Sequence, residues 1–366
     1  MIAAPARRCT GGEVLNREHG APVVTLDPRP AGADLFGRPL RDLRISVTDR
    51  CNFRCPYCMP RDTFHDRYRF LPTADRLSLE EIARLARLFV AGGARKVRLT
   101  GGEPLLRSNL ADLVGELSVI AGLDDLALTT NGMLLAQHAA ALKAHGLKRV
   151  TVSLDSLDPG VFRQMSGGFD GLDRVLDGIA AAREAGLAPV KINTVVQRGV
   201  NDHTFLDLVG HFRNTGVIVR LIEYMDAGNR NHWQPDRVVP SQELRNLIHA
   251  RWPLAPVAGH YRGEVADRYL FADGGGEVGF ISSVSQPFCG DCTRARLSSD
   301  GRLFTCLFST SGTDLRGPLR AGAGDQELVG RIRAAWAVRE DRYSEQRRLL
   351  QHKAPLARIE MHYIGG

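Results

Sequence analysis

The sequence predicts an α/β protein whose core is an incomplete (βα)6 barrel of the TIM type, followed by a smaller region. Six strand-like segments alternate with helix-like segments between residues 43 and 222, and small polar residues follow several of the strands. The alternation stops near residue 230. Strands that alternate with helices form a parallel sheet with right-handed crossovers, and ligand sites lie at the carboxyl ends of the strands.

The individual elements follow from local sequence patterns. Strands are expected at residues 43–48, 96–100, 126–129, 149–154, 189–195 and 217–222, and helices at 78–92, 108–120, 134–144, 172–185, 202–214 and 241–250. Ser78 and Glu81 form a capping box at the start of the first helix, which ends near Gly92 and Gly93. The polar segments 101–104, 129–132, 153–156 and 223–225 follow strands, so we expect them on one rim of the barrel.

The chain is expected to have three parts. Residues 1–36 are rich in Gly, Pro, Ala and Arg, and we expect a mobile N-terminal extension with a stray thiol at Cys9. Residues 37–259 are expected to form the partial barrel. Residues 260–366 are expected to form a C-terminal region that carries a second cysteine group and a Gly-Gly tail. The 366 residues, with 43% hydrophobic and 24% charged side chains, are typical of a globular protein with a large core.

Charge and hydropathy limit the classes of partner. No run of 18 apolar residues and no apolar signal segment is present, so we expect a cytoplasmic protein without a membrane partner. The net charge of +7 comes almost wholly from arginine, since the chain has only five lysines. It is either a solvated basic surface or a site for a polyanionic substrate, because the arginine fork matches phosphate oxygens. No basic run with interleaved aromatics predicts a specific nucleic-acid partner.

The cysteines form the strongest pattern in the sequence. Seven are present, and six of them fall into two groups of three, so a disulfide framework is not expected. The first group, Cys51, Cys55 and Cys58, has the spacing C-x3-C-x2-C, and one loop with three thiolates can hold an iron–sulfur cluster. Zinc is the alternative, but structural zinc takes four ligands, and His65 is the only nearby candidate for a fourth.

Three thiolates on a four-iron cluster leave one iron with an open coordination site, which can bind the amino and carboxylate groups of S-adenosylmethionine (SAM). The cysteine loop, with Tyr57 between its last two cysteines, resembles that of the radical SAM superfamily. The segment Gly101-Gly102-Glu103-Pro104 matches the GGEP motif of the same superfamily. The resemblance implies that one electron from the cluster cleaves SAM to a 5′-deoxyadenosyl radical.

The second group, Cys289, Cys292 and Cys306, has the spacing C-x2-C-x13-C. A zinc knuckle is the alternative interpretation, but no histidine lies between these cysteines. A second open four-iron cluster fits the three thiolates better. Its free iron could bind a nitrogen or oxygen atom of a substrate.

The second group extends into a longer pattern, F-C-x2-C-x-R-x-R-L followed by C-L-F, which resembles the GTP 3′,8-cyclase family. That family begins molybdenum cofactor biosynthesis. Arg44, Thr48 and Asp49 fit the family, as do the segments 96–104 and 191–195 and the tail that ends in Gly365 and Gly366. The resemblance runs from about Leu43 to the last residue. Thr293 and Ala295 depart from it, because the family usually has Asn at the first position and a bulkier residue at the second.

The resemblance implies a set of site residues and cofactors. SAM contacts are implied for Tyr57, Gly102, Glu103, Ser153 and Met225. GTP contacts are implied for Arg44, Arg98, Thr129, Lys191, Arg294, Ala295 and Arg296, with Gly365 and Gly366 reaching into the site. The implied cofactors are two [4Fe–4S] clusters and SAM.

The implied reaction removes hydrogen from C3′ of GTP and joins C3′ to C8 of guanine, and the product is (8S)-3′,8-cyclo-7,8-dihydroguanosine 5′-triphosphate. The implied partners are a reductase or flavodoxin-type electron donor and a downstream cyclic pyranopterin monophosphate synthase. A homodimer is left open. Two alternatives also stay open: a radical SAM peptide-modifying enzyme with an auxiliary cluster, and a non-enzymatic regulator with two zinc sites.

Overall fold

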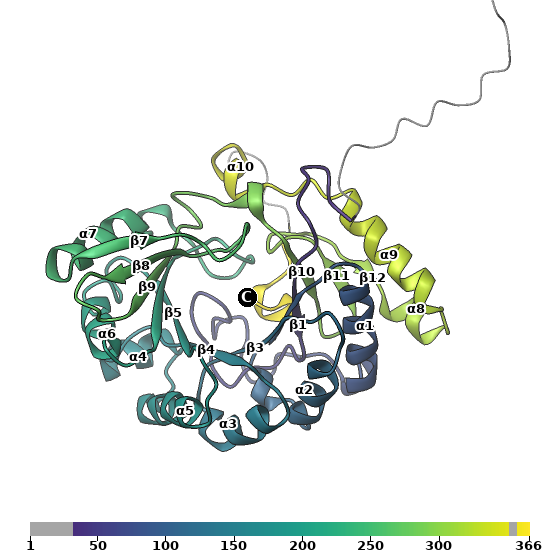
Figure 1. The fold of residues 1–366 in the computed structure, drawn as a ribbon, viewed down its shortest axis with the longest axis horizontal. Coiled ribbons are helices and arrows are strands. Elements are labelled where there is room, and N and C mark those ends of the chain that lie inside the picture. Colours follow the sequence, from purple (N-terminus) through teal and green to yellow (C-terminus); the bar gives the residue numbers. More distant parts are fainter. Residues whose placement is uncertain (1–31, 351–356) are drawn as a thin grey trace, which may run out of the picture.

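The computed structural model describes residues 32–350 and 357–366 (Figure 1). The expected mobility of residues 1–31, with Cys9, lies outside the described residues. The strands form one twelve-stranded sheet in the order β12-β11-β10-β1-β2-β3-β4-β5-β6-β9-β8-β7. The sheet curves around a central space, and the C-terminus lies within that curve (Figure 1). The predicted incomplete barrel is confirmed, because the sheet is rich in parallel pairs and does not close.

The six predicted strands are present as consecutive parallel neighbours. They are β1 (Asp42–Ser46), β2 (Lys96–Thr100), β3 (Asp125–Thr130), β4 (Arg149–Ser153), β5 (Lys191–Val196) and β6 (Ile218–Glu223). The helices between and after them are α1 (Leu79–Ala91), α2 (Leu110–Ser118), α3 (Leu135–Ala144), α5 (Leu172–Glu184), α6 (Phe205–Phe212) and α7 (Ser241–Arg251). The capping box of α1 is confirmed, since Glu81 N donates to Ser78 Oγ at 3.1 Å and Ser78 N donates to Glu81 Oε2 at 2.8 Å. The sequence analysis missed α4 (Pro159–Met165), although Asp158 caps it and Pro159 follows.

The C-terminal region adds strands to both sides of this parallel set. β10 (Arg294–Leu297) pairs in parallel with β1, and β9 (Glu277–Ile281) pairs in parallel with β6. The outer strands β7 (Leu254–Val257), β8 (Asp267–Phe271), β11 (Arg302–Phe304) and β12 (Thr313–Asp314) pair antiparallel. The second cysteine group is thereby brought beside β1, which precedes the first group.

The remaining helices lie near the C-terminal end of the chain. They are α8 (Arg316–Arg320), α9 (Asp325–Ala337), α10 (Tyr343–Leu350) and α11 (Met361–Ile364), and α9 packs on α1 while α11 packs on β1. None of the helices in residues 32–350 and 357–366 has the length and apolar character needed to cross a membrane.

Alternation along the strands separates a core face from a site face. On β1, β2 and β10 the outward residues are almost fully buried under the helices: Leu43, Ile45, Val97, Leu99, Ala295 and Leu297. The register aligns Arg44 of β1 with Arg98 on one side and Arg296 on the other. Three arginines on adjacent strands therefore stand side by side on the inner face.

Candidate active site

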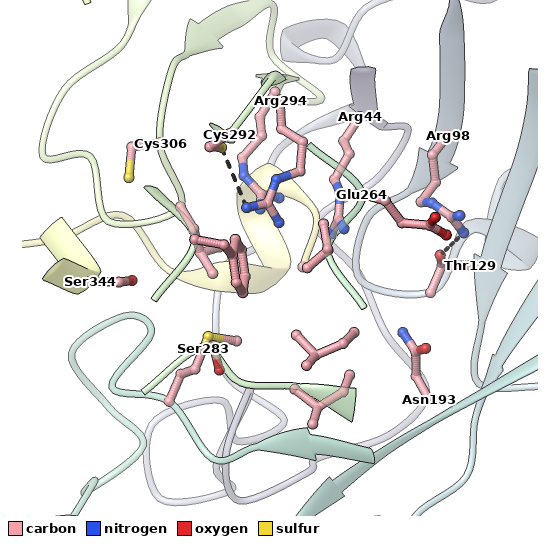
Figure 2. Close-up of a pocket in the computed structure, with 18 of the residues that line it drawn as sticks. Arg44, Arg98, Thr129, Asn193, Glu264, Ser283, Cys292, Arg294, Cys306 and Ser344 are labelled. Atoms are coloured by element: carbon pink, nitrogen blue, oxygen red, sulfur yellow. Dashed lines mark hydrogen bonds between the residues drawn. The ribbon is translucent and has the colours of Figure 1, made fainter. Parts of the chain in front are cut away.

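A cavity of about 1360 Å³, part of it open to solvent, occupies the inside of the curved sheet. Nine lysine and arginine side chains line it, against the two carboxylates of Glu264 and Asp341; the cations are Arg44, Lys96, Arg98, Arg149, Lys191, Arg220, Arg294, Arg296 and Arg339. Figure 2 shows Arg44, Arg98 and Arg294 extending from neighbouring strands into this space. An excess of buried cations fits a ligand that carries several negative charges.

Most of these cations already have partners within the protein. Arg98 donates to the hydroxyls of Thr129 at 2.8 Å and Thr151 at 3.1 Å. Arg149 Nε donates to Asp125 Oδ1 at 2.9 Å, and Arg220 lies 3.7 Å from the Glu264 carboxylate. These bonds fix the orientation of the side chains around the cavity.

Arg44 and Lys191 differ from their neighbours. Neither side chain has a hydrogen bond or an ion pair with another described residue, although Lys191 is only 8% exposed. Burial lowers the pKa of Arg44, and Arg296 and Arg294 lower it further. Burial, followed by the charges of Arg220 and Arg149, lowers the pKa of Lys191 to about 7. A bound anion would satisfy both groups.

The first cysteine group lies on the loop after β1, and all three thiols are free and partly exposed. The backbone N of Phe53 donates to Cys51 Sγ at 3.3 Å, and the Asn131 amide lies 3.9 Å from the same sulfur. Burial and then Glu103 raise the pKa of Cys51 to about 12, while burial and Cys51 raise the pKa of Cys55 and Cys58. The thiols are therefore protonated in the free protein, and a metal group would displace these protons.

The second cysteine group lines the cavity. Cys289 lies in the 3-10 turn Cys289–Asp291, Cys292 follows that turn, and Cys306 follows β11. Arg294 donates to Cys292 Sγ at 3.4 Å (Figure 2). Burial opposes ionisation of Cys292, but the charges of Arg294 and Arg339 outweigh it and lower its pKa to about 6. Burial and Asp341 raise the pKa of Cys306 to about 12.

The two sulfur sets fit a cluster better than a zinc ion. Within the described part of the chain, no three Cys, His, Asp or Glu side chains are gathered so that they could hold a single ion. Structural zinc needs four donors at about 2.0–2.3 Å from one centre. In a four-iron cluster each thiolate binds a different iron, so its ligands stand farther apart. Three thiols without a fourth ligand fit that donor set.

Tyr57 and Asp155 join the first cysteine loop to the end of β4. The Tyr57 hydroxyl donates to Asp155 Oδ2 at 2.8 Å, and Asp155 Oδ1 accepts from the backbone N of Val195 at 2.9 Å. Burial raises the pKa of Asp155 to about 6. Ser153 ends β4 nearby in sequence, and Met225 lines the cavity.

The GGEP segment packs directly against the first cysteine loop. A Cβ on Gly102 would lie 2.2 Å from the carbonyl oxygen of Arg50, so only glycine fits there. The Glu103 carboxylate accepts from the Thr130 hydroxyl at 2.7 Å and from the backbone N of Asn131 and Leu105 at 2.7 and 3.0 Å. These protein bonds give Glu103 a role in holding the rim together, and its implied contact with SAM stays a prediction.

The two departures from the family pattern are explained by strand alternation. Thr293 donates from its hydroxyl to Asp42 Oδ2 at 2.7 Å, at the start of β1 and away from the cavity lining. Ala295 is fully buried on the core face, and Arg294 and Arg296 on either side of it line the cavity. Ala295 therefore sets the spacing of the two arginines, and its own contact with GTP stays a prediction.

Sequence reasoning missed several cavity residues. Lys96 and Arg149 begin β2 and β4, Arg220 lies in β6, and Tyr261 and Glu264 lie in the loop before β8. The period-2 alternation with Arg98, Thr151 and Lys191 would have placed the first three on the inner face. No comparable signal marks the loop residues.

The C-terminal tail reaches the cavity. Gly366 lines it, and the Gly365 carbonyl accepts a hydrogen bond from Arg296. Gly365 has φ +76°, and a Cβ there would lie 2.2 Å from Cγ2 of Thr100. The tail can occupy this position only if residue 365 has no side chain.

Gly365→Ala is expected to lower product formation roughly tenfold or more, because a left-handed conformation costs alanine about 1–2 kcal/mol and the methyl group also meets Thr100. Single-turnover product formation measures the effect. Adding Thr100→Ala removes the clashing methyl and is expected to restore part of the rate. A Gly365→Ala enzyme with the parent rate would show that the tail does not need this position.

The partial parallel barrel, the cysteine loop after its first strand and the Gly-Gly-Glu-Pro rim define a radical SAM enzyme. The chain matches the family described as Radical SAM superfamily over residues 45–212 and that described as Molybdenum Cofactor Synthesis C over residues 217–345. It is similar in fold to the crystal structure of Streptococcus suis SuiB bound to S-adenosylmethionine, with a TM-score of 0.55 and 16% identity over 90% of this chain and 76% of that one.

Curated relatives then identify the family. The chain is 56% identical to a GTP 3′,8-cyclase of Xanthomonas campestris pv. campestris (strain 8004) over 91% of this chain and 97% of the relative. It is 52% identical to that of Acidothermus cellulolyticus over 86% and 88%, and 44% identical to that of Staphylococcus epidermidis (strain ATCC 12228 / FDA PCI 1200) over 91% and 98%. The chain belongs to the GTP 3′,8-cyclase family and is an enzyme, a radical SAM lyase of molybdenum cofactor synthesis.

Proposed function

We propose that this enzyme converts GTP to (8S)-3′,8-cyclo-7,8-dihydroguanosine 5′-triphosphate with one [4Fe–4S] cluster at each cysteine group. The observation that carries the proposal is the cavity, where nine cations face two carboxylates and the second cysteine group lies in the same lining. Arg44 and Lys191 supply unpaired positive charge for a triphosphate. A purine nucleoside triphosphate combines this charge with a base that can reach a metal.

The residues of the chain would hold the substrate at both ends. Cys51, Cys55 and Cys58 would hold the first cluster, which when bound supplies the electron that cleaves SAM to a 5′-deoxyadenosyl radical. Tyr57, Gly102, Ser153 and Met225 would position SAM, and the cations of β1, β2, β5 and β10 would hold the triphosphate. Cys289, Cys292 and Cys306 would hold the second cluster beside the guanine.

Fixing the guanine and the phosphates leaves the ribose between them, so C3′ and C8 are kept close together. Such fixed geometry can contribute up to roughly 7–11 kcal/mol to lowering a barrier. The buried lining and the Gly365–Gly366 tail exclude water, which protects a radical from side reactions.

The partners follow from the chemistry. A reductase or flavodoxin-type protein would supply the electron, and a cyclic pyranopterin monophosphate synthase would consume the product. The cytoplasm provides the reducing conditions that such clusters need. A homodimeric state is left open.

An anaerobic assay with dithionite, SAM and GTP tests the proposal. The expected result is a cyclised nucleotide that forms with 5′-deoxyadenosine, and about eight irons per chain after reconstitution. Release of 5′-deoxyadenosine with peptides but no cyclised nucleotide from GTP would favour a peptide-modifying enzyme. Two zinc ions and no 5′-deoxyadenosine would favour a regulator.

Lys191 provides a pH test of the triphosphate site. Its pKa of about 7 in the free protein rises when a polyanion binds, so GTP affinity is expected to fall as pH increases from 7 to 9. Lys191→Met should weaken binding roughly ten- to a hundredfold at pH 7, since a hydrogen bond to a charged group contributes about 1.5–3 kcal/mol.

Equilibrium binding of GTP between pH 6.5 and 9 measures both effects. Lys191→Arg is the matched control, because it keeps the charge but does not titrate in this range. Lys96, whose pKa burial lowers to about 8, remains in all three proteins, so their difference reports Lys191 alone. Equal pH profiles for the parent and Lys191→Arg would exclude Lys191 from the phosphate contacts.

A further inference from the structure

A buried Arg–Asp–Arg cluster lies directly behind the second cysteine group, outside all the motifs of the sequence. Asp34 is fully buried, and Arg38 and Arg339 are 1% and 3% exposed. We propose that Asp34, Arg38 and Arg339 form a positioning triad that holds the cysteine-bearing segments of the second group in place for its cluster. The inference rests on the second cluster of the proposed function.

Asp34 fixes both arginines. Its Oδ2 accepts from Arg38 Nε at 2.5 Å and from Arg339 Nη1 at 3.1 Å. Its Oδ1 accepts from the backbone N of Phe36 and of Arg38, each at 2.9 Å. One carboxylate thus orients two guanidinium groups from segments about 300 residues apart in the chain.

The two arginines reach all three cysteine-bearing segments through backbone carbonyls. Arg38 Nη1 donates to the Cys289 carbonyl at 2.7 Å. Arg339 Nη1 donates to the Cys292 carbonyl at 2.7 Å, and its Nε donates to the Thr305 carbonyl at 3.0 Å. Because Thr305 directly precedes Cys306, each cysteine is held at its own carbonyl or at that of its neighbour.

Charge also connects the triad with a cluster. Two arginines and one aspartate leave one net positive charge in a dry environment, and Arg38 Nη2 is buried without a partner among the described residues. A buried charge is costly, and apolar residues would stabilise the fold as well or better if packing were its only purpose. A four-iron core with three thiolates is anionic, so nearby positive charge and ordered ligands both favour its binding.

The test uses two variants whose side chains do not line the cavity, Asp34→Asn and Arg38→Met. Each is placed in two backgrounds of the full chain. In one, Cys51, Cys55 and Cys58 are alanine, so that only the second group can bind iron. In the other, Cys289, Cys292 and Cys306 are alanine, so that only the first group can. Iron per chain and the electron paramagnetic resonance signal of the reduced cluster are measured after anaerobic reconstitution.

The expected result is specific to one group. The second-group background should bind about four irons, and either variant should reduce this to about one or fewer and broaden or abolish the signal. In the first-group background both variants should keep about four irons, which shows that the barrel is folded.

Three results would overturn or redirect the inference. Full iron and an unchanged signal in the second-group background with both variants would refute the positioning role. Loss of iron in both backgrounds would show a general folding role and refute it equally. If the second-group background without either variant binds no iron, the second cluster itself is wrong, and that failure is distinguishable from the other two.

Discussion

Cys306→Ala is expected to abolish the cyclised nucleotide while the first cluster remains. The second group would keep only two of its three thiolates, Cys289 and Cys292, on the short turn before β10. Two ligands on one turn do not enclose a four-iron cluster, so the guanine would lose its metal contact. Loss of that fixed geometry should lower the rate at least about a hundredfold, because proximity contributes several kcal/mol.

Three measurements separate this effect from general damage. Iron should fall from about eight to about four per chain, and slow release of 5′-deoxyadenosine should continue without product. Cys9→Ala is the matched control, since it removes a thiol outside both groups and should leave iron and product unchanged. A Cys306→Ala enzyme that forms product at the parent rate would remove the second cluster from the proposed function.

The strand–helix rhythm and the cysteine spacings made the fold and both cysteine groups predictable. Strands such as Lys96–Thr100 have buried, β-branched or apolar residues at the expected period, and the helix after Ser78 carries its own start and stop signals. The cysteine triads were visible because metal chemistry requires a fixed residue type at a fixed spacing.

Residues that act through tertiary contacts gave no such signal. Asp34 lies in a stretch rich in Gly and Pro and was assigned to the extension, yet it is fully buried and pairs with Arg339 from the other end of the chain. β9 and β10 are short and follow no strand–helix alternation, so the sequence did not indicate that they join β6 and β1. Contacts between distant segments depend on the assembled sheet, which local patterns do not encode.

Gly167 is another residue of this kind, and it leads to the second large effect. It follows α4, which sequence reasoning missed, and has φ +80°. A Cβ at Gly167 would lie 2.0 Å from the carbonyl oxygen of Arg54, between Cys51 and Cys55. The backbone N of Arg54 also donates to the Ser166 carbonyl at 3.0 Å, so the turn after α4 holds the first cysteine loop.

Gly167→Ala is therefore expected to displace that loop and to abolish both SAM cleavage and product formation. The contact is with backbone, which cannot rotate away as a side chain can, so the loop must shift by more than an ångström. The first cluster should be lost and the second kept, which lowers iron from about eight to about four per chain.

Gly199→Ala is the matched control for this prediction. Gly199 has a similar φ of +71°, but nothing lies within 4 Å of its added Cβ. It should show only the conformational cost of about 1–2 kcal/mol, seen as a lower melting temperature with iron and activity retained. If both variants lose the first cluster to the same extent, backbone strain and not the contact with Arg54 is the cause. If Gly167→Ala keeps eight irons and cleaves SAM, the turn after α4 does not position the cluster loop, and the loop must be held by its other bonds, such as that of Arg54 to the Phe64 carbonyl at 2.6 Å.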